Sequence, residues 1–198
     1  MTAPSHGEAV AEVLPIPGQD QLGPLVDAFD AAAERVLAPL RGHAATDRVF
    51  STASHLGDFS LIWHLAGLGR GIAKGRLDQT IVLAALLGAE SLIVNQGVKR
   101  LFRRERPTET GADRLRVRRP STSAFPSGHA SSAAFAATVL IGWDGRRLGL
   151  LWAAMAAVVG TSRAYVRIHH ASDVVGGAVL GVGLGLLGRR LARRLVPS

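Results

Sequence analysis

Apolar residues are gathered into five runs, and charged residues lie mostly between them. The runs cover residues 60–69, 81–98, 133–143, 148–161 and 174–188. Most are shorter than the roughly 20 residues that cross a bilayer core, but Gly, Ala, Ser and Thr at their ends can extend each run to spanning length. The pattern predicts an all-α fold: a polytopic membrane helical bundle of about five to six helices. A soluble bundle with Gly-rich buried helices is the alternative, since a hydrophobic fraction of 47% is ordinary for soluble proteins.

The N-terminal part of the chain follows a different pattern. Residues 1–20 contain three prolines and no helical period, which predicts a disordered N-terminal arm without the apolar core of a signal peptide. From 22 to 40, apolar residues recur at helical spacing while Asp and Glu occupy other faces. This predicts an amphipathic N-terminal helix lying on the membrane or along the bundle. A single membrane-embedded domain would fill residues 21–198.

Two segments in the first half are candidate crossings. Residues 54–72 hold Trp63 in an apolar stretch with a polar start, and they predict a first crossing. Residues 79–102 form the longest periodic element, interrupted by Glu90. Because a central acid is costly in lipid, we expect Glu90 to face the bundle interior and to make a buried structural hydrogen bond.

Charge and cysteine content narrow the possible functions. The net charge of +8 suits either a nucleic acid or an anionic membrane surface. Nucleic-acid binding has little support, since the basic segment 99–119 contains one aromatic residue, Phe102. The chain has no Cys, which excludes disulfides, thiolate nucleophiles and Cys-ligated metals.

Three polar clusters carry candidate chemistry. The first holds Lys99 and Arg106 within the basic segment, whose other arginines we interpret as a solvated or headgroup-facing surface. The second is Pro126-Ser127-Gly128-His129 at the predicted start of a helix, where free backbone amides and the helix dipole attract an anion.

The third cluster runs from Ser162 to Asp173. Arg163 can bind a phosphate through two parallel hydrogen bonds. His169 precedes Asp173 by four residues, so on a helix the carboxylate could hold the imidazole and make it a nucleophile. Four apolar runs begin at residues 81, 129, 148 and 174, with a turn at 144–147. If each run crosses the membrane once, all three clusters lie on the same side of it.

The ordered triple resembles the signature of the type 2 phosphatidic acid phosphatase superfamily. It consists of Lys99, six residues and Arg106-Pro107; then Pro126 to His129; then Ser162-Arg163, five residues, His169, three residues and Asp173. The resemblance implies that His169 attacks phosphorus to form a phosphohistidine, with Asp173 orienting it. His129 would then protonate the leaving group and later activate water. The groups implied to hold the phosphoryl oxygens are Lys99, Arg106, Ser127, the Gly128 amide and Arg163. No metal or other cofactor is implied, and His170 is interpreted as structural or headgroup-contacting.

The resemblance predicts a small bacterial integral membrane enzyme with a lipid phosphate or diphosphate as substrate. A polyprenyl phosphate or diphosphate is favoured, while phosphatidylglycerol phosphate and phosphatidate remain open. Rival hypotheses are a vanadium haloperoxidase and a non-enzymatic membrane protein that binds anionic lipid. The clusters carry no information on oligomeric state or on transfer to acceptors other than water.

The side of the membrane on which the site lies is not decided by charge. The three cations predicted to act in the site are Lys99, Arg106 and Arg163. Without them, the segments on the site side carry eight cations and those on the other side carry nine, so the positive-inside rule favours neither orientation. The resemblance implies a site facing outward from the cell (inner) membrane. A cytoplasm-facing site is the alternative.

Overall fold

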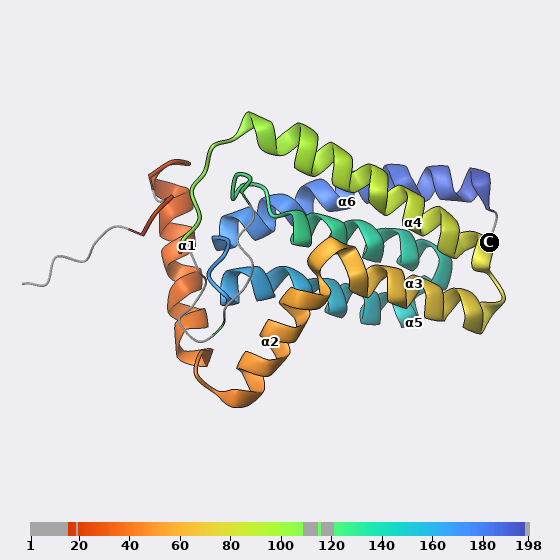
Figure 1. The fold of residues 1–198 in the computed structure, drawn as a ribbon, viewed down its shortest axis with the longest axis horizontal. Coiled ribbons are helices and arrows are strands. Elements are labelled where there is room, and N and C mark those ends of the chain that lie inside the picture. The colour runs from red at the N-terminus through yellow and green to blue at the C-terminus, as the bar shows by residue number, and fades with distance from the viewer. Residues whose placement is uncertain (1–15, 19, 109–114, 116–120, 197–198) are drawn as a thin grey trace, which may run out of the picture.

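The computed structural model describes residues 16–18, 20–108, 115 and 121–196, and that part of the chain holds helices and no strand. The α-helices are α1 (Pro24–Leu37), α2 (Ala44–Leu56), α3 (Leu61–Lys74), α4 (Leu77–Leu92), α5 (Gly128–Tyr165) and α6 (Ala171–Leu195). Short π and 3-10 segments carry the chain on from α4 to Leu101. Helices α3 to α6 run side by side, and α1 and α2 lie at one end of this bundle (Figure 1). The predicted all-α bundle with an N-terminal helix is confirmed, whereas the arm predicted for 1–20 lies mostly outside the described residues.

Helix α5 consists of two helices that run in opposite directions. Gly145 joins them with φ 70° and ψ −166°, a conformation that is essentially restricted to glycine. A Cβ built on Gly160 would lie 3.6 Å from that of Ala130, so the second half returns beside the first. Asp144 stabilises the turn by accepting hydrogen bonds from Arg70 (2.8 Å) and Trp152 (2.9 Å). The turn predicted at 144–147 is therefore confirmed.

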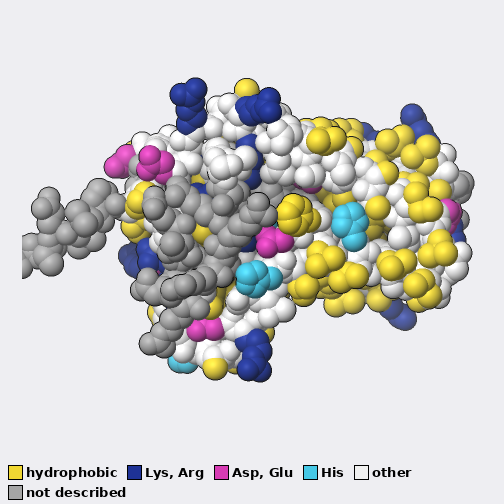
Figure 2. Space-filling view, in the orientation of Figure 1, with side chains coloured by type: hydrophobic (Ala, Val, Ile, Leu, Met, Phe, Trp, Pro, Cys, Tyr) yellow, Lys and Arg dark blue, Asp and Glu magenta, His cyan; other side chains and the backbone are white. Residues whose placement is uncertain are grey.

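Within the described residues, three stretches are long and apolar enough to cross a membrane: Leu77–Leu101, Gly128–Tyr165 and Ala171–Leu195. On the face seen in Figure 2, apolar side chains spread over the bundle away from α1, as expected of a lipid-facing surface. The chain is a membrane protein. The crossing predicted over 54–72 is wrong in its bounds, because the helix breaks where Phe59 and Ser60 adopt positive φ. Helix α3 has 14 residues, about 21 Å of helix against a core of about 30 Å.

Two buried contacts explain how the bundle packs. Glycines along α6 face the first half of α5 so closely that a Cβ on Gly181 would lie 2.2 Å from the carbonyl oxygen of Ser131. Glu90 is buried and accepts a hydrogen bond of 2.5 Å from the Ser131 hydroxyl. The structural interpretation of Glu90 is confirmed.

Helix α1 is amphipathic, but its polar face points inward. Leu25 and Val36 are 86% and 68% exposed, and Phe29 is also exposed, whereas Asp30 is only 6% exposed. At 100° per residue these three apolar side chains form one narrow stripe. Helix α1 thus packs its charged face on the end of the bundle and presents an apolar stripe outward.

Candidate active site

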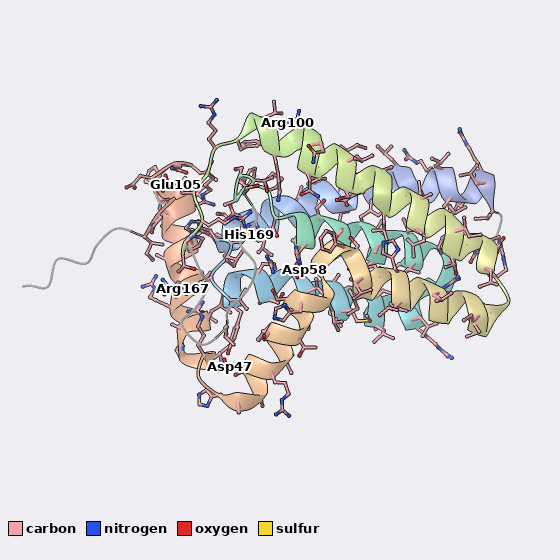
Figure 3. All side chains as sticks on the ribbon, viewed as in Figure 1. Asp47, Asp58, Arg100, Glu105, Arg167 and His169 are labelled. Atoms are coloured by element: carbon pink, nitrogen blue, oxygen red, sulfur yellow. The ribbon has the colours of Figure 1, made fainter. Side chains whose placement is uncertain are left out.

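The predicted site residues lie together at the α1 end of the bundle. Figure 3 shows His169 between α1 and the long helices, and Asp58 at the turn that joins α2 to α3. The segments that meet here are the 98–108 stretch, both ends of α5, the 166–170 turn and the start of α6. The crossing pattern predicted that the three polar clusters would meet, and the structure brings them together.

His169 stands at the centre, with 3% of its surface exposed. Arg106 Nη1 donates a hydrogen bond of 3.0 Å to its Nε2. A guanidinium can only donate, so Nε2 carries the lone pair and a neutral ring has its proton on Nδ1. Nε2 is therefore the nitrogen whose lone pair can act as a nucleophile.

The pKa of His169 lies well below its ordinary value of 6.5, first because the ring is buried and then because basic groups face it. These groups are Arg106, Arg163, Lys99 and His129. The imidazole is consequently neutral at physiological pH, which is the protonation state that a nucleophile needs.

Asp173 lies beside His169, but not in the way its spacing suggested. Helix α6 begins at Ala171, so His169 belongs to the preceding turn and the two residues do not share a helix. Asp173 Oδ2 accepts a hydrogen bond of 2.9 Å from the His170 amide and lies 3.4 Å from His169 Nδ1. The contact with the imidazole is an approach without hydrogen-bond geometry, and among the described residues His169 Nδ1 has no hydrogen-bond partner.

Arg163 and Lys99 supply buried positive charge. Arg163 is 1% exposed and donates through Nη1 to Ser54 Oγ at 2.5 Å. Its Nε and Nη2 are buried without a hydrogen-bond partner in the described part of the chain. Unpaired buried donors are costly, and an anion bound here would satisfy them.

The start of α5 lies against these cations. Ser127 is the N-cap, its Oγ accepts a weak bond from the Ala130 amide at 3.4 Å, and Gly128 opens the helix. A Cβ on Gly128 would lie 3.5 Å from the Lys99 ammonium and 2.9 Å from Asn95 Oδ1. The predicted helix start is thus confirmed, and the Lys99 ammonium lies close to its first residue.

His129 faces α2 and the turn after it. Its Nε2 lies 3.0 Å from Asp58 Oδ1 and 3.2 Å from the Ser54 carbonyl oxygen. Burial acts to raise the pKa of Asp58, but the hydrogen bond and charge of His129, with Arg163 and His55, outweigh it and lower that pKa below 3.8. Asp58 is thus a carboxylate at physiological pH and can support a positive charge on His129.

Two functional neighbours of the site, Asp58 and Arg104, were missed by sequence reasoning, whereas His170 was interpreted as structural or headgroup-contacting. Asp58 was noted only as a polar residue near the first apolar run. Arg104 was assigned to the solvated basic surface, yet it is 4% exposed and donates to Asp173 and to Asp30 of α1, at 2.7 Å in each case. His170 is buried and its Nε2 lies 3.1 Å from the Pro17 carbonyl oxygen, in agreement with a structural role.

Comparisons with known proteins agree with this architecture. Decaprenylphosphoryl-5-phosphoribose phosphatase of Mycobacterium tuberculosis (strain ATCC 25618 / H37Rv) is 31% identical over 170 residues, which cover 82% of this chain and 92% of that protein. The enzyme of the same name from Mycolicibacterium smegmatis is 31% identical over 151 residues, covering 75% and 80%.

Two solved structures share the fold. The PAP2-type phosphatidylglycerolphosphate phosphatase from Bacillus subtilis superposes with a TM-score of 0.67 at 24% identity, over 88% of this chain and 89% of that one. Aquifex aeolicus LpxE gives 0.64 at 22% identity, over 86% and 98%. The model of the PAP2 superfamily matches residues 79–196, which include all eight predicted site residues. The chain therefore belongs to the PAP2 superfamily and is a membrane lipid phosphatase.

Proposed function

We propose that this lipid phosphatase hydrolyses the phosphate of a polyprenyl-linked lipid through a covalent phosphohistidine on His169. The observation that carries the mechanism is the placement of the His169 imidazole, whose Nε2 accepts from Arg106 beside the unpaired buried donors of Arg163. A nucleophile surrounded by fixed cations suits an anionic electrophile such as a phosphoryl group.

In the first step, His169 Nε2 forms a bond to phosphorus while the bond from phosphorus to the leaving oxygen breaks. His129 gives its proton to that oxygen, and the Asp58 carboxylate 3.0 Å away stabilises the charge that His129 carries beforehand. In the second step, His129 takes a proton from water, the water oxygen bonds to phosphorus and the N–P bond breaks. Phosphate leaves and His169 is again neutral.

Lys99, Arg106, Ser127, the Gly128 amide and Arg163 hold the phosphoryl oxygens in this proposal. Their fixed charges and helix-start amides neutralise the negative charge that a metal ion offsets in other phosphoryl-transfer enzymes. We therefore expect activity without a divalent ion.

A polyprenyl-linked substrate is supported by the two mycobacterial relatives, whose names specify a decaprenyl-phosphoryl sugar phosphate. The outward apolar stripe of α1 supports a site at the membrane surface, where a headgroup can react while its lipid tail stays in the bilayer. We further propose that the protein resides in the bacterial inner membrane with its site facing outward.

The test is phosphate release by detergent-purified protein in the presence of chelator. The panel holds polyprenyl monophosphate, polyprenyl diphosphate, a polyprenyl-phosphoryl sugar phosphate, phosphatidylglycerol phosphate and phosphatidate. The His169→Ala variant should lose activity and the covalent phosphoenzyme, whereas His43→Ala, at an exposed residue, should match the wild type. Full activity in His169→Ala would disprove the phosphohistidine route, and the best substrate in the panel decides between the lipid classes.

A further inference from the structure

A buried ion cluster lies on the Nδ1 side of the proposed nucleophile, opposite the Nε2 that accepts from Arg106. It joins Asp30 of α1, Arg104 of the basic segment, and Ser172 and Asp173 of α6. The side chains of Arg104, Asp30 and Asp173 are at most 4% exposed. Charged groups are buried in this way only when they are paired, so each member depends on the others.

Arg104 makes a hydrogen bond with every nitrogen of its guanidinium. Nη1 donates to Asp173 Oδ1 (2.7 Å) and Ser172 Oγ (2.6 Å), Nη2 donates to Asp30 Oδ2 (2.7 Å), and Nε donates to the Gly18 carbonyl oxygen (3.1 Å). With four of its five N–H donors used in this way, Arg104 is committed to the cluster rather than to the substrate phosphate. Its planar fork instead sets the position and orientation of two carboxylates.

Asp173 is held from both sides. Arg104 binds Oδ1, the His170 amide binds Oδ2, and this second oxygen faces His169 Nδ1 at 3.4 Å. The orientation of the carboxylate toward the imidazole therefore depends on Arg104. The Arg104 charge also offsets the negative charge that Asp173 presents to the ring.

Asp30 completes the cluster from a different part of the chain. Its Oδ1 accepts from the Ser172 amide and its Oδ2 from the Ser172 hydroxyl, at 2.7 Å in each case. It comes from α1, which lies outside the stretch matched by the family model. The N-terminal helix is thereby connected to the nucleophile through two ion pairs.

We propose that Arg104 and Asp30 are positioning residues that hold Asp173 against His169, so that α1 is part of the catalytic machinery. This inference rests on the proposed role of His169 as nucleophile. The groups that face His169 are Arg106 and Lys99 from the 98–108 stretch, Arg163 and His129 from α5, and Asp173 from α6, with His170 adjacent in sequence. Arg104 and Asp30 act on it through Asp173.

The sign of the pH effect follows from charge. Removing the Arg104 cation leaves the Asp173 charge uncompensated, which stabilises the imidazolium and raises the pKa of His169. The acid limb of kcat/KM should then move to higher pH, by about one unit for loss of one nearby charge. Removing the Asp30 anion acts oppositely, so the acid limb should move to lower pH.

The experiment measures kcat, KM and the pH profile on the best lipid substrate. Arg104→Gln should lower kcat by roughly 10- to 100-fold, the range found for residues that orient metal-binding histidines, with little change in KM. Arg104→Lys retains the charge and should keep the acid limb near that of the wild type while it recovers part of kcat. Asp30→Asn should shift the limb downward. Arg100→Gln, at an exposed arginine of the same segment, is the matched control and should behave as wild type.

Wild-type kcat in Arg104→Gln, or a loss of kcat with no shift of the acid limb, would overturn the inference. If Arg104→Gln does not fold, a wild-type kcat in Arg104→Lys together with an unshifted limb in Asp30→Asn would overturn it equally. Inactivity of His169→Ala in the same assays separates this failure from failure of the phosphohistidine proposal.

Discussion

The contact between Asp58 and His129 joins the proposed general acid to a residue far away in the sequence. Asp58 Oδ1 lies 3.0 Å from His129 Nε2. Since its pKa is lowered below 3.8, the carboxylate stays charged over the pH range in which such an enzyme works. Asp58→Asn should reduce kcat by about 10-fold, which is less than the whole contribution of general acid–base catalysis because His129 itself remains. KM should change little, because Asp58 is a carboxylate and is not among the residues proposed to bind the phosphate.

The control for this substitution is Asp78→Asn, at an exposed carboxylate paired with Arg76 away from the site. It should leave kcat unchanged. Steady-state kinetics should be measured on both variants. If Asp58 orients His129, Asp58→Asn should change kcat and leave KM as it is. A rise in KM at unchanged kcat in Asp58→Asn would contradict the assignment.

At this scale the sequence predicted which residues meet but not all of their partners. Lys99, His129 and His169 carry recognisable chemistry at recognisable spacings, and the fold brings them together. Asp58 and Arg104 had no such pattern, because one acid after a helix and one arginine among many are ordinary. Only the folded chain distinguishes them from the solvated surface, because it buries Arg104 and brings Asp58 to His129.

The packing of α6 on α5 depends on glycine at defined positions. A Cβ on Gly181 would lie 2.2 Å from the backbone oxygen of Ser131, which cannot move independently of its helix. Two residues later, no described atom lies within 4 Å of a Cβ on Gly183. Gly181→Ala should therefore destabilise the protein by about 1–3 kcal/mol through overpacking. Gly183→Ala should be neutral or stabilising by up to about 1 kcal/mol through helix propensity.

Thermal unfolding of the two variants in the same detergent measures this difference. Equal melting temperatures would show that α5 and α6 accommodate the added methyl group at residue 181 without loss of stability. The close approach of the two helices would then not contribute to the stability of the protein. The pair is informative because both substitutions add one methyl group to the same helix.

Helices with a strong apolar period were predicted well from the sequence. Helix breaks that lack a glycine or proline were not predicted. Gly145 lies in a polar turn, and the reversal within α5 was expected there. The break between α2 and α3 was missed because Phe59 and Ser60, rather than glycines, take positive φ. Nothing in the local sequence marks these residues, since a positive φ is uncommon for residues other than glycine.

At the scale of the whole molecule, the two ends of the bundle have different chemistry. One end holds the candidate site and the inward-facing charges of α1. The other holds the Arg70–Asp144 ion pair at the turn within α5. The number of crossings predicted that the site residues would gather at one end of the bundle. The cation count did not predict which side of the membrane that end faces. The direction of the site therefore requires a measurement.

The absence of Cys from the chain makes that measurement direct, since every introduced thiol is unique. Arg100 is exposed at the site end (Figure 3), and Arg146 is exposed at the turn at the opposite end. If the site faces outward, a membrane-impermeant maleimide added to intact spheroplasts should label Arg100→Cys, whereas Arg146→Cys should react only after permeabilisation. Labelling of Arg146→Cys alone in intact spheroplasts would place the site on the cytoplasmic side. Each variant should first be shown to retain phosphatase activity, because the two positions report on the native orientation only if the bundle is intact.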